Sequence, residues 1–68
     1  MEKLTLKAAR VNAGLTQVEA AKKIGVSDAT LLNYEKGRSF PDVCVLKRIE
    51  DVYGVEYKNI IFLVNEPI

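Results

Sequence analysis

Apolar side chains recur every three or four residues in four segments of the chain, at residues 6–13, 17–24, 28–36 and 43–53. This spacing is typical of helices that bury one face. The residues expected to face inward are, segment by segment, Leu6, Ala9 and Ala13; Ala20, Ala21 and Ile24; Leu31 and Tyr34; and Leu46, Ile49 and Tyr53. The pattern predicts an all-α, compact domain of four helices, with a possible fifth near the C-terminus.

The ends of these segments carry the residue types that start and stop helices. A side-chain oxygen able to accept from free backbone N–H groups precedes each segment, at Thr5, Thr16, Ser27 and Asp42. Thr16 and Glu19 also have the spacing of a capping box. A glycine follows each segment, at Gly14, Gly25, Gly37 and Gly54. We therefore expect short connections between the helices.

Composition narrows the class of protein. The 68 residues fit a single domain, residues 1–68, and 49% hydrophobic with 28% charged residues is ordinary for a globular protein. The chain lacks both a run of about 18 apolar residues and the pattern of a signal peptide, so we expect no membrane span and a cytoplasmic location. Histidine is absent and Cys44 is the only cysteine, which argues against an enzyme and a metal site. No cofactor or small-molecule ligand is expected.

The net charge of +1 conceals an uneven distribution. Residues 1–38 contain seven basic and four acidic residues, whereas residues 39–68 contain three basic and five acidic ones. A polyanion would therefore meet the N-terminal half of the chain.

The connection between the second and third segments has the most specific spacing. A small residue lies at Ala21, a glycine lies at Gly25, and apolar residues surround them at Ala20, Ile24, Val26, Leu31 and Tyr34. Two helices joined by so tight a turn cross steeply, so a small residue is needed where they approach and a glycine where the backbone becomes left-handed.

This pattern resembles the helix-turn-helix of the Cro and repressor family, also called XRE-like. The resemblance runs from LKAARVNAGLTQVEAAKKIGVS through YEKGR and FP to DVYGV. It implies a five-helix domain whose third helix lies in the DNA major groove, with dimers on two half-sites about one helical turn apart. Ala9 and Ala20 are smaller than the family's usual leucines, and Tyr53 is larger.

The third segment carries the candidates for base contact. With its apolar side turned inward, the helical period directs five residues outward: Asp28, Ala29, Leu32, Asn33 and Lys36. Asn33 suits a bidentate pair with adenine, and Asp28 can accept from cytosine N4. Ala29 and Leu32 can contact a thymine methyl group. The alternatives are a helix-capping role for Asp28, a plain helix position for Ala29, a solvated helix position for Asn33 and a protein contact for Leu32.

Candidates for phosphate contact flank this face. The resemblance implies that Gln17, at the start of the second helix where N–H groups favour an anion, contacts a phosphate. The remaining candidates are Ser27, Thr30, Lys36 and Arg38.

The resemblance also implies a salt bridge between Arg10 in the first helix and Glu35 in the third. Arg10 falls near the apolar side of its segment and Glu35 adjoins the inward Tyr34, so each is partly desolvated unless the two meet. We expect the pair to orient the third helix, because a buried pair often adds little net stability whereas breaking it is costly.

The C-terminal residues are less regular. A short helix is expected around residues 57–62, yet the run Ile60 to Val64 is rich in β-branched residues and suits a strand equally. Five successive apolar residues exceed what one face of a short helix buries, so we expect a homodimer interface at Ile61, Phe62, Leu63 and Val64. The alternative is that Tyr57, Ile60, Ile61 and Leu63 close the domain's own core.

These observations favour a sequence-specific protein that binds double-stranded DNA. The expected role is a bacterial or phage transcriptional regulator, acting as a repressor by occupying a palindromic operator at the nucleoid. The alternative is a protein-interaction module on the same fold, such as an antitoxin, with DNA binding secondary. A non-catalytic accessory factor that does not touch DNA is a further alternative.

Overall fold

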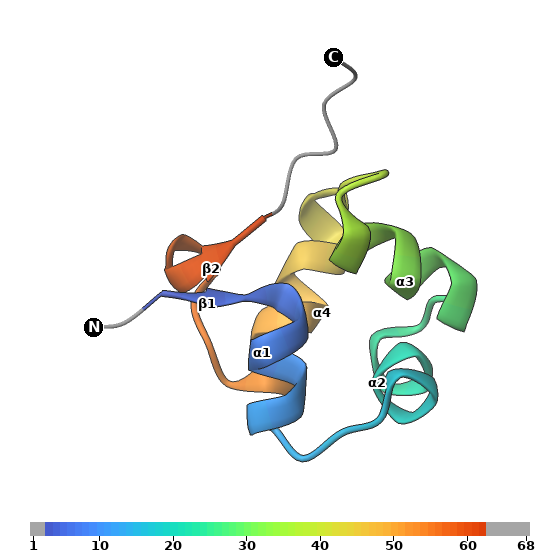
Figure 1. Ribbon diagram of the computed structural model, residues 1–68, viewed down its shortest axis with the longest axis horizontal. Helices are drawn as coiled ribbons and strands as arrows, with labels where there is room; N and C mark the ends of the chain where they lie inside the picture. The colour runs from blue at the N-terminus through green and yellow to red at the C-terminus, as the bar shows by residue number, and fades with distance from the viewer. Residues whose placement is uncertain (1–2, 63–68) are drawn as a thin grey trace.

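The computed structural model describes residues 3–62 of the chain, and most of them are helical (Figure 1). The elements in order are β1 (Leu4–Thr5), α1 (Leu6–Asn12), α2 (Gln17–Ile24), α3 (Asp28–Lys36), α4 (Val43–Tyr53), a 3₁₀ helix (Tyr57–Asn59) and β2 (Ile60–Ile61). The predicted fold class is confirmed, and the four helices differ from the predicted ranges only at the end of α1, which stops one residue earlier.

Side chains cap every α-helix at the predicted positions. The hydroxyls of Thr5, Thr16 and Ser27 accept from the backbone N–H groups of Ala8, Glu19 and Thr30, and the Asp42 carboxylate accepts from Val45. The Glu19 carboxylate in turn accepts from the Thr16 N–H at 2.9 Å, which completes the capping box. The hydrogen bond from the Thr16 backbone N–H is the main cause that lowers the pKa of Glu19, and the Thr16 side chain acts on the carboxylate in the same direction. Each helix therefore starts where its own sequence directs.

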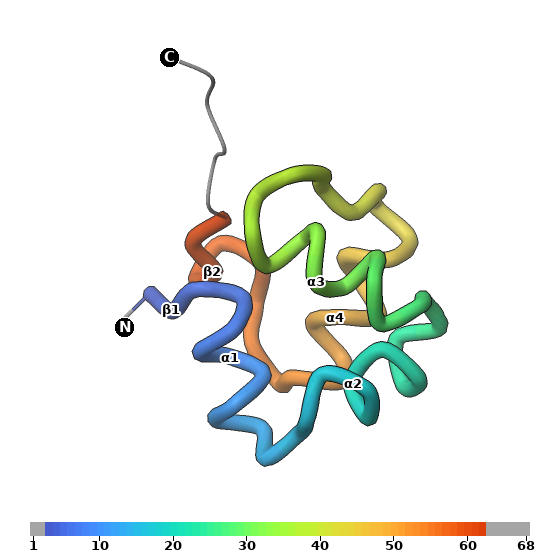
Figure 2. Tube along the Cα trace, turned by 45° about the vertical axis from the view of Figure 1, so that its right-hand side comes forward, coloured from blue at the N-terminus to red at the C-terminus, as the bar shows by residue number. Residues whose placement is uncertain are grey.

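The C-terminal part resolves the choice between helix and strand. Tyr57–Asn59 forms the 3₁₀ helix, and Ile60–Ile61 forms β2, which pairs in parallel with β1. Leu4 lies opposite Ile60 and Thr5 opposite Ile61, so the two ends of the described chain lie side by side (Figures 1 and 2). A helix over all of residues 57–62 is therefore wrong, because the β-branched Ile60 and Ile61 complete a sheet with β1 instead. Leu63 and Val64 lie outside the described residues.

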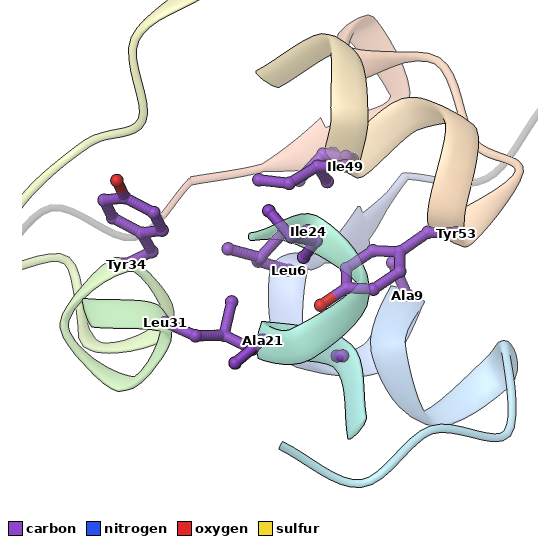
Figure 3. Packing of buried hydrophobic residues seen from close by; sticks show 10 residues of the cluster. Leu6, Ala9, Ala21, Ile24, Leu31, Tyr34, Ile49 and Tyr53 are labelled. Atoms are coloured by element: carbon purple, nitrogen blue, oxygen red, sulfur yellow. The ribbon is translucent and has the colours of Figure 1, made fainter. Parts of the chain in front are cut away.

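The core is formed where the four helices and β2 meet (Figure 3). Its buried members are Leu6, Ala9, Ala20, Ala21, Ile24, Leu31, Tyr34, Ile49, Tyr53 and Ile60. Most of the residues predicted to face inward are among them, but Ala13 is only half-buried and packs at the edge of the core. The small Ala9, Ala20 and Ala21 and the large Tyr53 ring of α4 are buried in the same cluster.

Leu46 departs from the predicted inward set. The inner face of α4 is formed by Val45, Ile49, Val52 and Tyr53, which follow the helical period. That face leaves Leu46 at its margin, where it lines two surface hollows instead of the core. Within the described part of the chain, none of the helices has the length and apolar character needed to cross a membrane.

Candidate functional site

The turn between α2 and α3 fixes the crossing of these two helices. Gly25 takes a left-handed conformation with φ of 89°, and its N–H and that of Val26 both donate to the Ala21 carbonyl, at 2.8 and 3.0 Å. Arg48 of α4 donates from Nη1 to the Ile24 carbonyl at 3.3 Å, at the end of α2. A Cβ atom on Gly25 would lie 3.3 Å from the same nitrogen. The left-handed backbone conformation therefore favours glycine at this position, and a larger residue would also require the Arg48 side chain to shift by a few tenths of an ångström.

Arg10 and Glu35 meet beneath the start of α2. Arg10 Nε donates to Glu35 Oε2 at 2.7 Å, and the two side chains are 10% and 5% exposed. Arg10 Nη1 also donates to the Leu15 carbonyl at 3.0 Å, which ties the α1–α2 connection to the pair. Gln17 Nε2 donates to Glu35 Oε1 at 3.3 Å. The carboxylate of α3 is thus held by side chains from both α1 and α2.

Tyr53 lies close to this pair from the core side. Burial raises the pKa of Tyr53 to about 12, and the nearby Glu35 carboxylate acts in the same direction, while Arg10 opposes it. The hydroxyl is buried and has no hydrogen-bond partner within residues 3–62. Tyr53 therefore contributes its ring to the core and carries an unpartnered polar atom beside the ion pair.

The outer face of α3 is open to solvent. We name it the reading surface and define it by five residues: Asp28, Ala29, Leu32, Asn33 and Lys36. Asp28, Ala29 and Lys36 are exposed, whereas Leu32 and Asn33 are half-buried. Asp28 Oδ1 accepts from the Ala29 N–H at 3.0 Å, so its carboxylate already engages the first turn of the helix. The five side chains lie along one helix face.

The candidates for phosphate contact lie at the two ends of α3 and at the start of α2. Ser27 Oγ caps α3 and donates to Thr30 Oγ1 at 2.8 Å. Arg38 follows the end of α3, where its backbone N–H donates to the Asn33 carbonyl at 2.9 Å and its side chain is exposed. Gln17 is at the start of α2, with its side-chain amide directed to Glu35. These residues frame the reading surface.

A hollow of about 350 Å³ lies between α1, α2 and α3. We name it the polar hollow; its lining residues are Lys7, Arg10, Gln17, Leu32, Glu35 and Lys36. Sequence reasoning did not single out Lys7. The available signal was its position one helical turn before Arg10, which places both on the same side of α1.

A second surface is apolar. We name it the apolar surface and define it by Phe40, Val43, Leu46, Tyr57 and Phe62, which line two hollows that share Leu46. Phe40, Val43 and Tyr57 are 55%, 69% and 57% exposed, far more than core residues of their kind. Of the residues predicted to form a dimer interface, Ile61 is exposed, whereas Phe62 lines this surface but is half-buried against the core. Leu63 and Val64 lie beyond the described residues.

Metal ligands are not gathered anywhere in the described part of the chain. Within residues 3–62 no three His, Cys, Asp or Glu side chains lie close enough to hold an ion. Cys44, in the first turn of α4, is free and exposed.

Comparisons with known proteins bear on this arrangement. The sequence model of a family described as helix-turn-helix matches residues 6–58. The chain is 39% identical over 57 residues to a protein of Methanothermobacter thermautotrophicus named an uncharacterized HTH-type transcriptional regulator, covering 84% of this chain and 83% of the relative. It is 42% identical over 50 residues to the HTH-type transcriptional regulator ImmR of Bacillus subtilis, covering 74% of this chain but 39% of ImmR.

A third relative is named uncharacterized HTH-type transcriptional regulator MJ0272, from Methanocaldococcus jannaschii. It is 38% identical over 55 residues, which cover 81% of this chain and 83% of the relative. No solved structure gives a significant match. The matched residues 6–58 include all four α-helices and therefore the reading surface and the polar hollow.

Proposed function

This chain belongs to the helix-turn-helix family, and from this premise we propose that it regulates transcription by binding double-stranded DNA in a sequence-dependent way. The observation that carries the proposal is the exposed outer face of α3, fixed in direction by the Gly25 turn and by the Arg10–Glu35 pair. Helices of this kind enter the major groove, where base edges present a distinct pattern for each base pair.

In this proposal the residues of the reading surface contact the base edges. The Asn33 amide offers a donor and an acceptor, which suit adenine N7 and N6. Ala29 and Leu32 present methyl groups toward thymine, and Asp28 can accept from cytosine N4 in addition to its helix-capping hydrogen bond.

Phosphate contacts position the domain on the duplex. Lys36 and Arg38 are exposed cations at the C-terminal end of α3, and Ser27 and Thr30 supply hydroxyls at its N-terminal end. Gln17 adds the first N–H groups of α2 and, once released from Glu35, its side-chain amide. Such contacts set register and orientation without reading sequence.

We infer that the protein acts as a homodimer on a palindromic operator, as a repressor in a bacterial or phage system, with Ile61, Phe62, Leu63 and Val64 at the interface. The exposed apolar surface next to Phe62 supports this, because contiguous exposed apolar side chains on a small domain mark contact sites. A two-fold axis there would repeat the reading helix on a second half-site.

Replacing Phe62 and Val64 with serine tests the dimer. Because Phe62 is half-buried against the core, circular dichroism and thermal unfolding first check that the doubly substituted chain is folded. The folded chain should sediment as a monomer and bind a two-half-site duplex at least about tenfold more weakly, since one half-site contact is lost. Val11→Ser is the matched control, because Val11 is 58% exposed but lies on α1. An unmodified chain that stays monomeric at high concentration, both alone and on the duplex, would rule the dimer out.

Selection from a random duplex library, at two salt concentrations, tests the function itself. Recovery of a palindromic motif, with weaker binding at the higher salt, is the expected result. Retention of DNA without any motif would leave a non-specific binder, and no retention at either salt would exclude DNA binding.

A second candidate function rests on the apolar surface. Phe40, Val43 and Tyr57 could receive a protein partner, as in an antitoxin whose DNA binding is secondary. Under that alternative, substitutions at the apolar surface abolish partner binding while the motif recovered from the library is unchanged.

A further inference from the structure

The polar hollow has an excess of positive charge. Three of its lining residues are basic, Lys7, Arg10 and Lys36, and Glu35 is the acidic one. The 2.7 Å contact between Arg10 and Glu35 neutralises that pair within the buried part of the hollow. The other ion pair recorded among residues 3–62 joins Lys58 to Glu56, so no carboxylate of the described chain neutralises Lys7 or Lys36. The two lysines therefore give the hollow its net charge.

Other hollows of the molecule do not share this property. One contains Lys23 together with Asp51, and another contains Lys47 together with Glu50. In each of these the basic and acidic side chains balance. An anion is thus favoured in the polar hollow over these two sites.

The polar hollow also adjoins the surface that we propose reads DNA. Leu32 and Lys36 belong both to its lining and to the reading surface. An anion that enters this hollow would therefore lie beside a base pair contacted by α3. The chemical group that occurs at such a place on a duplex is the phosphodiester of the backbone.

We propose that Lys7 contacts a phosphodiester group of the bound DNA in the polar hollow, opposite Lys36, so that α1 takes part in DNA binding as well as α2 and α3. This inference rests on the proposed function. Lys7 Nζ and Lys36 Nζ donate to the phosphate oxygens from the two sides of the hollow, above the Arg10–Glu35 pair.

Lys7 carries this contact better than Gln17 does. The Gln17 amide already donates to Glu35, and its release costs that hydrogen bond. The Lys7 ammonium is exposed, forms no ion pair with the described residues and brings a full charge to the phosphate.

The test is the salt dependence of binding to the duplex recovered from the random library. Lys7→Gln should lower the steepness of log affinity against log salt by about 0.9, because one fewer counterion is released. Lys7→Arg should restore the steepness, because it keeps the charge. Lys23→Gln is the matched control: it removes the same charge from the balanced hollow and should leave the steepness unchanged. Since Lys7 is exposed, the thermal unfolding of the variant should match that of the unmodified chain.

Two results would overturn the inference alone. One is an unchanged steepness in Lys7→Gln, and the other is an equal fall in Lys7→Gln and Lys23→Gln, which would reveal an effect of net charge only. If the unmodified chain binds no duplex from the library, both the proposed function and this inference are wrong.

Discussion

The reading surface and the apolar surface differ in how their side chains are fixed. In the reading surface, Asp28 Oδ1 accepts from the Ala29 N–H, and polar residues that flank the surface are held by partners: Ser27 by Thr30, and Gln17 and Arg10 by Glu35. On the apolar surface, Val43 and Tyr57 are more than half exposed. The hydrogen bonds of its residues within 3–62 are made by backbone groups, among them the Tyr57 N–H to Glu50 and the Leu46 N–H to the Asp42 carbonyl, both at 2.8 Å. One surface is oriented within the domain, whereas the other exposes apolar area that only a partner can bury.

This difference indicates which kind of partner each surface suits. Preorganised polar groups suit a partner with a fixed pattern of donors, acceptors and charges, because their orientation is established before binding. Exposed apolar side chains suit a protein partner, since the gain comes from area removed from water. The reading surface therefore should depend on the buried pair beneath it, and the apolar surface should not.

Breaking the Arg10–Glu35 pair should have the largest effect, because the pair holds the reading surface and is not part of the apolar surface. Either single alanine substitution should lower the free energy of unfolding by about 3 kcal/mol, because it leaves an uncompensated buried charge. The double substitution should cost clearly less than the sum of the two. Denaturant unfolding of the four proteins measures this, and additive losses would show that the two residues do not act together.

Asn33→Ala separates base contact by the reading surface from phosphate contact beside it. It should reduce affinity for the selected duplex by about 1 to 3 kcal/mol and relax the preference at one base pair in each half-site, as loss of a bidentate contact requires. Arg38→Ala is the comparison, and it should weaken binding to all sequences alike. Repeating the library selection with each variant measures this; an Asn33 variant that recovers an unaltered motif would exclude Asn33 from base reading.

Tyr53→Phe should have the smallest effect on stability and on DNA binding. Tyr53 lies in the core beside the Arg10–Glu35 pair and is not part of the reading surface. Removal of the unpartnered hydroxyl should raise the free energy of unfolding by about 1 kcal/mol near neutral pH. The Tyr53 pKa rises from 10.0 to about 12 on folding, so the unfolded chain ionises first and stability falls as pH increases from 10 to 12.

That alkaline loss should be smaller in the Tyr53→Phe protein than in the unmodified chain. Urea unfolding at pH 7, 10 and 11.5 compares the two, and DNA affinity at pH 7 should be equal. A variant that is less stable at pH 7 would mean that the hydroxyl has a favourable partner.

Local signals made the helices predictable. Thr16 and Glu19 lie three residues apart and form the capping box through contacts between neighbouring residues alone. Gly25 likewise ends α2 through its own backbone conformation. The pairing of Ile60 with Leu4 joins the two ends of the described chain, so no window of sequence contains it. The position of Leu46 likewise depended on which side of α4 the other helices cover.

In the candidate site, too, some residues follow from the local sequence and others depend on how the helices pack. The outer face of α3 follows from helical periodicity, which is why Asp28, Ala29 and Asn33 could be named in advance. Lys7 reaches the polar hollow only because α1 packs beside α3, and the Gln17 hydrogen bond to Glu35 depends on the packing of α2 beside α3. Contacts between separate helices require the tertiary structure.

The central claim is that the outer face of α3 contacts DNA bases, and backbone and side-chain amide chemical shifts test it most directly. The unmodified chain, labelled with nitrogen-15, is titrated with the duplex recovered from the library. The account predicts the largest changes along Asp28–Lys36, at the start of α2 and in the Asn33 side-chain amide. Changes confined to residues around Val43, Leu46 and Tyr57, with α3 unaltered, would contradict it.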